Sequence, residues 1–155
     1  MLLNSFYALV ATFGFAVMFN IKGKNLVFAS LGGGLSWLIY LLAFDHLGFS
    51  NVGSFFIASA IASTYSEIAA RLLKTPVTTF IICAIIPLVP GGGMYNTMFQ
   101  SIQGNITESL GLGIQTLSIA GTVAVASFFV SSIAKAIVLF RRRLKLNFYK
   151  NNKIR

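Results

Sequence analysis

The sequence predicts an all-α integral membrane protein with five transmembrane helices. The first observation is composition, since 56% of the 155 residues are hydrophobic and only 10% are charged, with a mean hydropathy of +0.81. Soluble domains have about 45–50% apolar and about 25% charged residues. The second observation is that the apolar residues form long runs of the length that crosses about 30 Å of hydrocarbon. The third is that basic residues occur in alternate connections between these runs.

The first two predicted spans cover about residues 2–20 and 26–44. At about 1.5 Å per residue, each is long enough to cross roughly 30 Å. No basic segment precedes the first run, so we expect a retained span and not a cleaved signal peptide. The second run contains Gly32-Gly33-Gly34. Small residues let membrane helices approach closely, so we interpret these glycines as packing residues, with a ligand contact as the alternative.

The third predicted span, residues 52–73, carries a polar stripe at helical spacing: Ser59, Ser63, Ser66 and Glu67. Glu67 is the only acidic residue inside a predicted span. Intramembrane carboxylates are usually functional, so Glu67, Ser63 and Ser66 are candidates for coupling or gating. Arg71 follows Glu67 by four residues on the same face, and the alternative is therefore an interfacial ion pair.

The fourth predicted span covers about residues 76–104 and is broken near residues 87–93. Thr75 and Pro76 provide a start signal for its first half. Pro87 and Pro90 then stop the helix, because proline removes a backbone donor and clashes with the preceding turn. Three glycines follow and are free to adopt positive φ, so we expect a second half-helix from Met94.

The fifth predicted span covers residues 114–140. We expect its stripe of small residues to pack closely on another helix: Ala120, Ala124, Ser127 and Ser131. Residues 1–140 thus form one five-helix domain. Residues 141–155 hold seven of the twelve Lys and Arg residues, and we interpret them as a basic cytoplasmic tail on anionic lipid. Such clustering fits a membrane surface and argues against a nucleic-acid partner.

The connections predict the orientation of the chain. Those after the first and third spans carry Lys22, Lys24, Arg71 and Lys74, whereas those after the second and fourth carry no basic residue. The positive-inside rule therefore places the N-terminus outside and the C-terminus inside.

The broken fourth span is the candidate substrate site. Under this orientation its second half begins near the middle of the bilayer, with its N-terminus facing into the protein. A helix N-terminus carries partial positive charge and unpaired N–H groups, which suits a carboxylate. We assign substrate binding to Gly91, Gly92, Gly93, Asn96 and Thr97. The alternative is a kink that only packs against the glycines of the second span.

Other functional groups give no sign of catalysis or of a cofactor. Asp45 and His46 lie together at an outer helix end, and a lone histidine without ligand spacing does not indicate a metal. Cys83 is the only cysteine, so disulfides and thiolate metal sites are excluded. We expect no metal and no cofactor.

The segment from Pro87 to Tyr95, PLVPGGGMY, together with the five-run layout resembles the threonine/serine exporter family. Larger members of that family fuse two membrane halves, whereas members of the split, two-component form provide the halves as separate chains. The closer resemblance is to the small, YjjB-like membrane subunit of this split form. The resemblance covers roughly residues 1–140. It implies export of small hydroxy amino acids, or of dicarboxylates such as succinate, across the bacterial plasma membrane. It also implies a second membrane subunit as partner. The motif positions that carry over are Pro87, Pro90, Gly91, Gly92, Gly93 and Tyr95, and on this ground Tyr95 joins the predicted substrate-binding residues.

We therefore expect a subunit of a secondary transporter, not an enzyme, that binds a small carboxylate. Transporter folds are commonly built from two related repeats, and no second PxxPGGG occurs here, so a partner chain or a homo-oligomer would complete the cavity. One alternative is a structural subunit whose partner carries the substrate path. Another is an intramembrane enzyme that uses Glu67 or His46, although neither has an accompanying catalytic group.

Overall fold

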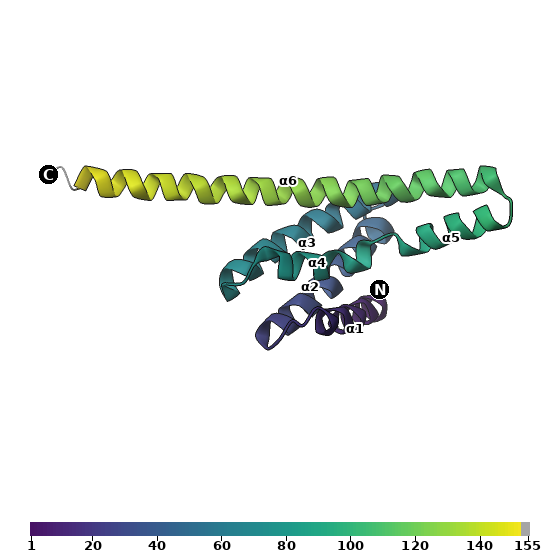
Figure 1. The fold of residues 1–155 in the computed structure, drawn as a ribbon, viewed down its shortest axis with the longest axis horizontal. Coiled ribbons are helices and arrows are strands. Elements are labelled where there is room, and N and C mark those ends of the chain that lie inside the picture. The colour runs from purple at the N-terminus through teal and green to yellow at the C-terminus, as the bar shows by residue number, and fades with distance from the viewer. Residues whose placement is uncertain (153–155) are drawn as a thin grey trace.

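A computed structural model describes the backbone of residues 1–152 and the side chains of residues 1–140. The side chains of the predicted tail, residues 141–155, therefore lie outside the described residues. The described chain is all helical, as predicted (Figure 1). Its elements are α1 (Leu2–Met18), α2 (Lys24–Leu41) with a π-helical end (Leu42–His46), α3 (Asn51–Leu73), α4 (Val77–Ile85) with a 3-10 end (Ile86–Leu88), α5 (Gly91–Ile102) and α6 (Ile106–Asn152).

Helices α1 to α4 form a bundle in which α2 and α3 are central. Small residues make this packing possible. On α2, Gly32, Gly33 and Gly34 are all buried, and a Cβ added at Gly33 would lie 2.6 Å from the Cβ of Thr12 on α1. A Cβ at Gly32 would lie 3.0 Å from the ring of Tyr65 on α3. The interpretation of these glycines as packing residues is confirmed.

Replacing Gly33 by alanine is expected to lower stability, because the new methyl group would collide with Thr12. Overpacking of this kind costs about 1–3 kcal/mol. Gly14→Ala on α1 is the matched control, since nothing lies within 4 Å of a Cβ there, and alanine favours helix over glycine by about 1 kcal/mol. Thermal unfolding in detergent should show a lower Tm for Gly33→Ala only. Equal Tm values for the two variants would contradict this assignment.

The break in the fourth predicted span is present. The segment Val77–Leu88 and helix α5 meet at an angle of 50°, and Val89 between them is extended. The expected glycine loop is wrong, because α5 begins at Gly91 and positive φ occurs at other glycines: Gly23, Gly48 and Gly104. The N–H of Met94 donates to the carbonyl of Pro90 at 3.0 Å, and this closes the first turn over the three glycines.

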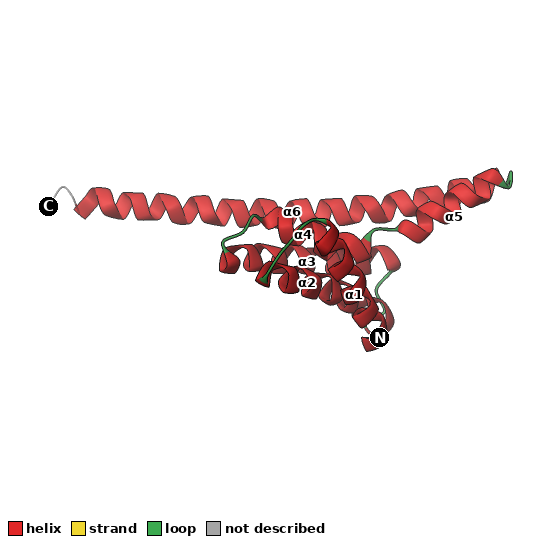
Figure 2. Cartoon of the chain, turned by 60° about the horizontal axis from the view of Figure 1, so that its bottom comes forward, coloured by secondary structure: helices red, strands yellow, loops and turns green. Residues whose placement is uncertain are grey.

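Helices α5 and α6 form a hairpin that projects away from the bundle (Figures 1 and 2). Gly104, with φ +82°, makes the turn between them. Small residues again allow close contact, since a Cβ at Gly93 would collide with Thr116 and one at Gly113 would lie 3.3 Å from Thr97. The Ser109 hydroxyl also donates to the carbonyl of Thr97 at 2.9 Å.

The face through which α6 packs on the bundle matches the predicted stripe only in part, since the Oγ of Ser127 is buried and Ala120 and Ser131 are half-buried. Its buried residues there are Ile119, Val123 and Ala126, whereas Ala124 of the predicted stripe is exposed. The aliphatic side chains contact Phe55, Ala58 and Leu88 in one core cluster.

Two helices of the described chain are long and apolar enough to cross a membrane, Lys24–His46 and Ile106–Phe140, and a third crossing results if the bent pair α4–α5 is one span. Helix α1 is a shorter apolar helix of 17 residues. Helix α3 has buried serines in place of part of the apolar surface: Ser54, Ser59, Ser63 and Ser66. Because α6 extends from Ile106 to Asn152, it is longer than the predicted fifth span at both ends.

Candidate functional site

The start of α5 presents two adjacent backbone amides. Among the described residues, the N–H groups of Gly92 and Gly93 have no hydrogen-bond acceptor, whereas those on either side of them do. Gly91 donates to the carbonyl of Val89 at 2.7 Å, and Met94 donates to Pro90. Unpaired amides at a helix N-terminus add to the positive end of the helix dipole. This arrangement can bind an anionic oxygen such as that of a carboxylate.

The predicted site residues divide into two groups in the structure. Gly91, Gly92, Tyr95 and Asn96 are exposed, and nothing lies within 4 Å of a Cβ at the first two. Tyr95 stacks on Phe99, with their ring centroids 6.1 Å apart. The proline half of the motif does pack near α2, since the 3-10 end Ile86–Leu88 contacts that helix and a Cβ at Gly32 would lie 3.2 Å from the Cβ of Ala84.

Gly93 and Thr97 face α6 instead. The Thr97 hydroxyl donates to the carbonyl of Gly93 at 2.7 Å, and its methyl group lies beside Gly113. The start of α5 was expected to face into the protein, and this expectation is wrong for the described chain. No residue of α5 is buried, and α6 is the only element that α5 contacts substantially in the part of the chain that the structure describes.

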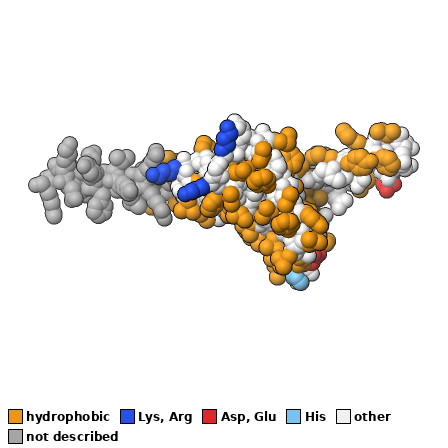
Figure 3. Space-filling view, turned by 90° about the horizontal axis from the view of Figure 1, so that it is seen from below, with side chains coloured by type: hydrophobic (Ala, Val, Ile, Leu, Met, Phe, Trp, Pro, Cys, Tyr) orange, Lys and Arg blue, Asp and Glu red, His pale blue; other side chains and the backbone are white. Residues whose placement is uncertain are grey.

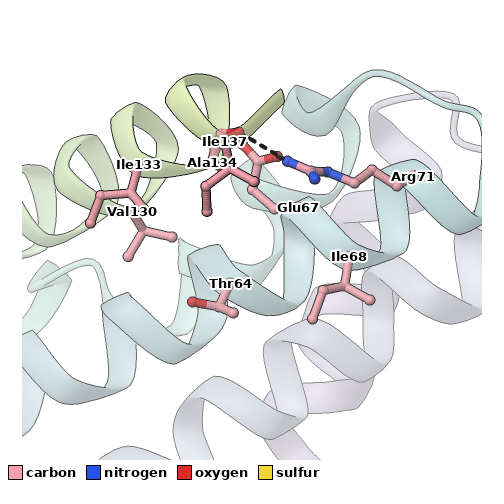
Figure 4. Close-up of a pocket in the computed structure, with 8 residues that line it drawn as sticks. All are labelled: Thr64, Glu67, Ile68, Arg71, Val130, Ile133, Ala134 and Ile137. Atoms are coloured by element: carbon pink, nitrogen blue, oxygen red, sulfur yellow. Dashed lines mark hydrogen bonds and ion pairs between the residues drawn. The ribbon is translucent and has the colours of Figure 1, made fainter. Parts of the chain in front are cut away.

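A second group of polar residues lies between α3 and α6 (Figure 4). An Nη2 hydrogen of Arg71 donates to Glu67 Oε2 at 3.2 Å, and Nη2 also donates to the carbonyl of Ala134 at 3.3 Å. The predicted ion pair at i, i+4 spacing is thus present. The Glu67 side chain is only 12% exposed and that of Arg71 is 45% exposed.

The ion pair opens onto a cavity of about 330 Å³. Its other walls combine one hydroxyl with aliphatic side chains from both helices: Thr64, Ile68, Val130, Ile133, Ala134 and Ile137. Sequence reasoning found Glu67 and Arg71 but missed the wall from α6. The sequence does not indicate which residues of α6 form this wall, because most faces of α6 carry apolar residues in this region.

The serines predicted to act with Glu67 differ in their hydrogen bonding. The Ser66 hydroxyl donates to the carbonyl of Ala62 at 2.8 Å. The Ser63 hydroxyl is fully buried and has no hydrogen-bond partner among the described residues, and the same holds for the Oγ of Ser127 on α6. Most serines in this bundle donate to a carbonyl one turn earlier, so these two hydroxyls remain available for another partner.

Asp45 and His46 are exposed at the end of α2 and do not approach Glu67. His46 precedes α3, and Glu67 lies sixteen residues after the start of that helix, a separation of about 24 Å along its axis. The two side chains therefore cannot form a catalytic pair. In the described part of the chain, no three His, Cys, Asp or Glu side chains lie close enough to hold a metal.

The basic residues lie at one end of the bundle. Asn25, next to Lys24, donates to the Thr75 hydroxyl at 3.1 Å, so the start of α2 and the end of α3 meet there. On the face drawn in Figure 3, Lys and Arg side chains gather on the left, and the acidic side chains and histidine lie to the right. Of the charged side chains visible on this face, the basic ones therefore lie toward one end and the acidic ones toward the other.

An all-α fold with long apolar helices and one-sided basic charge is typical of a multi-pass membrane protein, and a broken helix occurs in many transporters. Residues 4–133 match the family described as Threonine/Serine exporter, ThrE. The chain belongs to the threonine/serine exporter family, as its PxxPGGG segment predicted. It is therefore a transporter of the exporter kind. No solved structure matches the chain.

Proposed function

We propose that this chain is one subunit of a secondary transporter in the bacterial plasma membrane. It exports small metabolites that carry a carboxylate, either threonine- and serine-type amino acids or a dicarboxylate such as succinate. Family membership supports export. The observation that carries the proposal is the pair of free amides at the exposed start of α5, which suits the carboxylate that these substrates share.

In this proposal the carboxylate binds at Gly91, Gly92 and Gly93, next to Tyr95 and Asn96. The two exposed glycines allow a ligand to reach the backbone, because a side chain at either position would project over the amides. Thr97 contributes by fixing the first turn, since its hydroxyl is bonded to Gly93. Glu67, Ser63 and Ser66 lie apart from this site, on α3, and are proposed to act in coupling or gating.

A partner completes the site. Large apolar side chains of α5 are exposed, including Met98 at 70% and Ile102 at 87%. Lipid can cover these side chains, but lipid cannot bond the free amides of Gly92 and Gly93. A second membrane subunit of the same family, or a second copy of this chain, would cover α5 and enclose the amides. Anionic lipid is the proposed contact of the basic residues 141–155, which lie outside the described side chains.

The proposed topology has five spans, with the N-terminus outside and the C-terminus inside. Helices α1, α2 and α3 are the first three, the bent pair α4–α5 is the fourth and α6 is the fifth. The basic end of the bundle supports this orientation, because Lys24 and Lys74 are the chain neighbours of Asn25 and Thr75, which are bonded to each other there, and basic residues favour the cytoplasmic side.

Counterflow in proteoliposomes tests the proposal. Labelled threonine, serine and succinate are each offered to the chain alone and to the chain co-expressed with a second membrane subunit of the family. We expect uptake of at least one substrate that requires both subunits. Uptake by the chain alone would identify a homo-oligomer. If neither preparation takes up any of the three, the proposed function is wrong. Loss of uptake in the variants Asn96→Ala or Glu67→Gln of this chain, with the complex still intact, would exclude the structural-subunit alternative.

A further inference from the structure

A second cavity, of about 500 Å³, lies next to the Glu67–Arg71 pair at the basic end of the bundle. We infer that it is a binding site for one anionic phospholipid, with the lipid phosphate at Arg71 and Lys135 and an acyl chain along the apolar walls. This inference goes beyond the proposed function, because it holds whatever the chain transports. The site is also distinct from the proposed lipid contact of residues 141–155, since the walls described here belong to residues 67–139.

The packing of three helices creates the cavity. Helix α3 packs on both α4 and α6, whereas α4 and α6 do not pack substantially on each other in the described chain. The end of α3 forms the floor, where Ala70 is buried and its short side chain leaves depth. Pro76 and Val77 of α4 form one wall, and Val138 and Leu139 of α6 form the other. Because Pro76 and Leu139 are exposed, the cavity is a groove that is open at the surface of the bundle.

The surface around this groove is apolar. Leu72 on α3 and Ile137 and Leu139 on α6 are all exposed. In a chain that crosses a membrane, exposed apolar side chains of this kind contact the acyl chains of lipid. An empty groove would deprive its apolar lining of dispersion contacts, and an acyl chain lying in the groove supplies them. The shape and composition of the groove therefore suit a lipid tail.

The two basic residues of the groove lie at the level of lipid headgroups. Arg71 is two residues before the end of α3. Lys135 is five residues before the end of the apolar segment Ile106–Phe140. Both positions are near the edge of the hydrocarbon layer, where phospholipid phosphates lie. Basic pockets between membrane helices on the cytoplasmic side are known to bind anionic headgroups.

Both cations have hydrogen-bond donors that are available to a phosphate. Arg71 reaches from α3 to the backbone of α6 (Figure 4) and uses Nη2 toward Glu67 and Ala134, so its Nε–H and Nη1 hydrogens have no acceptor among the described residues. Lys135 forms no ion pair in the part of the chain that the structure describes. Two cations and the Glu67 carboxylate give the groove one net positive charge, which a phosphate diester with one negative charge balances.

The start of α4 adds positive potential to the same groove. Val77 lines the groove, and the N–H groups of Val77 and Thr78 have no acceptor among the described residues. The next N–H group, that of Thr79, donates to the carbonyl of Pro76 at 3.1 Å. The positive end of the α4 dipole therefore lies beside the two basic side chains and favours an anion there.

The charge and the walls of the groove together select the ligand. A zwitterionic phospholipid brings an ammonium group close to Arg71 and Lys135, and it has no net charge to balance theirs. Free phosphate offers the same anionic oxygens but leaves the apolar walls uncovered. An anionic phospholipid such as phosphatidylglycerol satisfies both parts of the groove.

Native mass spectrometry of the full chain in detergent, titrated with dioleoylphosphatidylglycerol, tests the inference. We expect the first bound lipid to be held at least about tenfold more tightly than dioleoylphosphatidylcholine, since basic side chains near the membrane surface each favour an anionic lipid. Inorganic phosphate should not displace it. Displacement by inorganic phosphate would identify a site for small anions and would overturn the assignment to a lipid.

Charge variants locate the phosphate. Lys135→Gln should weaken the first binding event about fivefold. Lys22→Gln is the matched control, because Lys22 is exposed and carries the same charge but does not line the groove. Glu67→Gln should strengthen binding, because it removes a like charge beside the phosphate. Equal effects of Lys135→Gln and Lys22→Gln, or weaker binding in Glu67→Gln, would overturn the inference.

A steric variant locates the acyl chain. Val138→Trp should fill the groove and weaken phosphatidylglycerol binding without a change in charge. Val125→Trp is the control on the same helix, since Val125 is exposed and does not line the groove. Undiminished binding in Val138→Trp would overturn the inference. Because every measurement here is a binding constant, failure of the lipid site can be told apart from failure of transport.

Discussion

Replacing Gly92 by leucine is expected to reduce transport at least about 100-fold while the chain still inserts and assembles. The leucine side chain would project into open space beside the free amides, where it would block the approach of a carboxylate. Two lost hydrogen bonds to a charged group are sufficient for a change of this size. Leucine also favours helix over glycine, so the first turn of α5 should not be weakened.

The initial rate of counterflow measures this effect, with size-exclusion profiles and thermal unfolding as tests of folding. Gly121→Leu is the matched control, because Gly121 lies in α6 and a Cβ there also meets nothing within 4 Å. Both variants should fold normally, and only Gly92→Leu should lose transport. Normal flux in Gly92→Leu would show that the amides of α5 do not form the substrate site.

Replacing Phe80 by alanine is expected to have the largest effect on stability. Phe80 on α4 is fully buried and is the largest of the fully buried side chains. It fills the space between small residues of α2 and α3, among them Ala29, Ala69 and Ala70, and their short side chains cannot move in to close a cavity. Truncation of a buried phenylalanine costs about 3–5 kcal/mol.

Unfolding of purified protein in mixed micelles with increasing denaturing detergent measures this loss. Ile82→Ala serves as the control on the same helix, since Ile82 is 47% exposed and faces away from that cluster. We expect a much earlier unfolding midpoint for Phe80→Ala than for Ile82→Ala. Equal midpoints would mean that the α2–α3–α4 core does not determine the stability of the chain.

The fold class and the helix break could be predicted because each depends on local chemistry. Pro87 and Pro90 exclude a continuous helix wherever the segment lies. The Glu67–Arg71 pair was predictable for the same reason, since two side chains four residues apart in one helix are neighbours on its surface. The conformation of the three glycines was harder to predict, because a residue that can adopt positive φ need not do so. In the structure a regular helical turn begins at Pro90 and includes them.

Contacts between helices could not be predicted to the same degree. Helix α6 is apolar on almost every side, so its sequence does not show whether Ala124 or Ala126 faces the bundle. For the same reason, the sequence did not predict which α6 residues line the cavity beside Glu67 and Arg71. Nor does any pattern in residues 91–102 show that α5 would pack chiefly on α6 in the described part of the chain, because apolar surface facing lipid and apolar surface facing protein have the same composition.

Helix α6 has a mechanical consequence. It contains no proline, it contacts both α3 and α5, and its 47 residues form a rod about 70 Å long. The chain between α4 and α5 is by contrast a two-residue connection, Val89 and Pro90. We expect any rocking of the bundle relative to the hairpin to bend this connection and to slide α3 along the rod. The sliding surface includes the contact of Arg71 with Ala134, so movement at one end of the molecule is expected to alter the other.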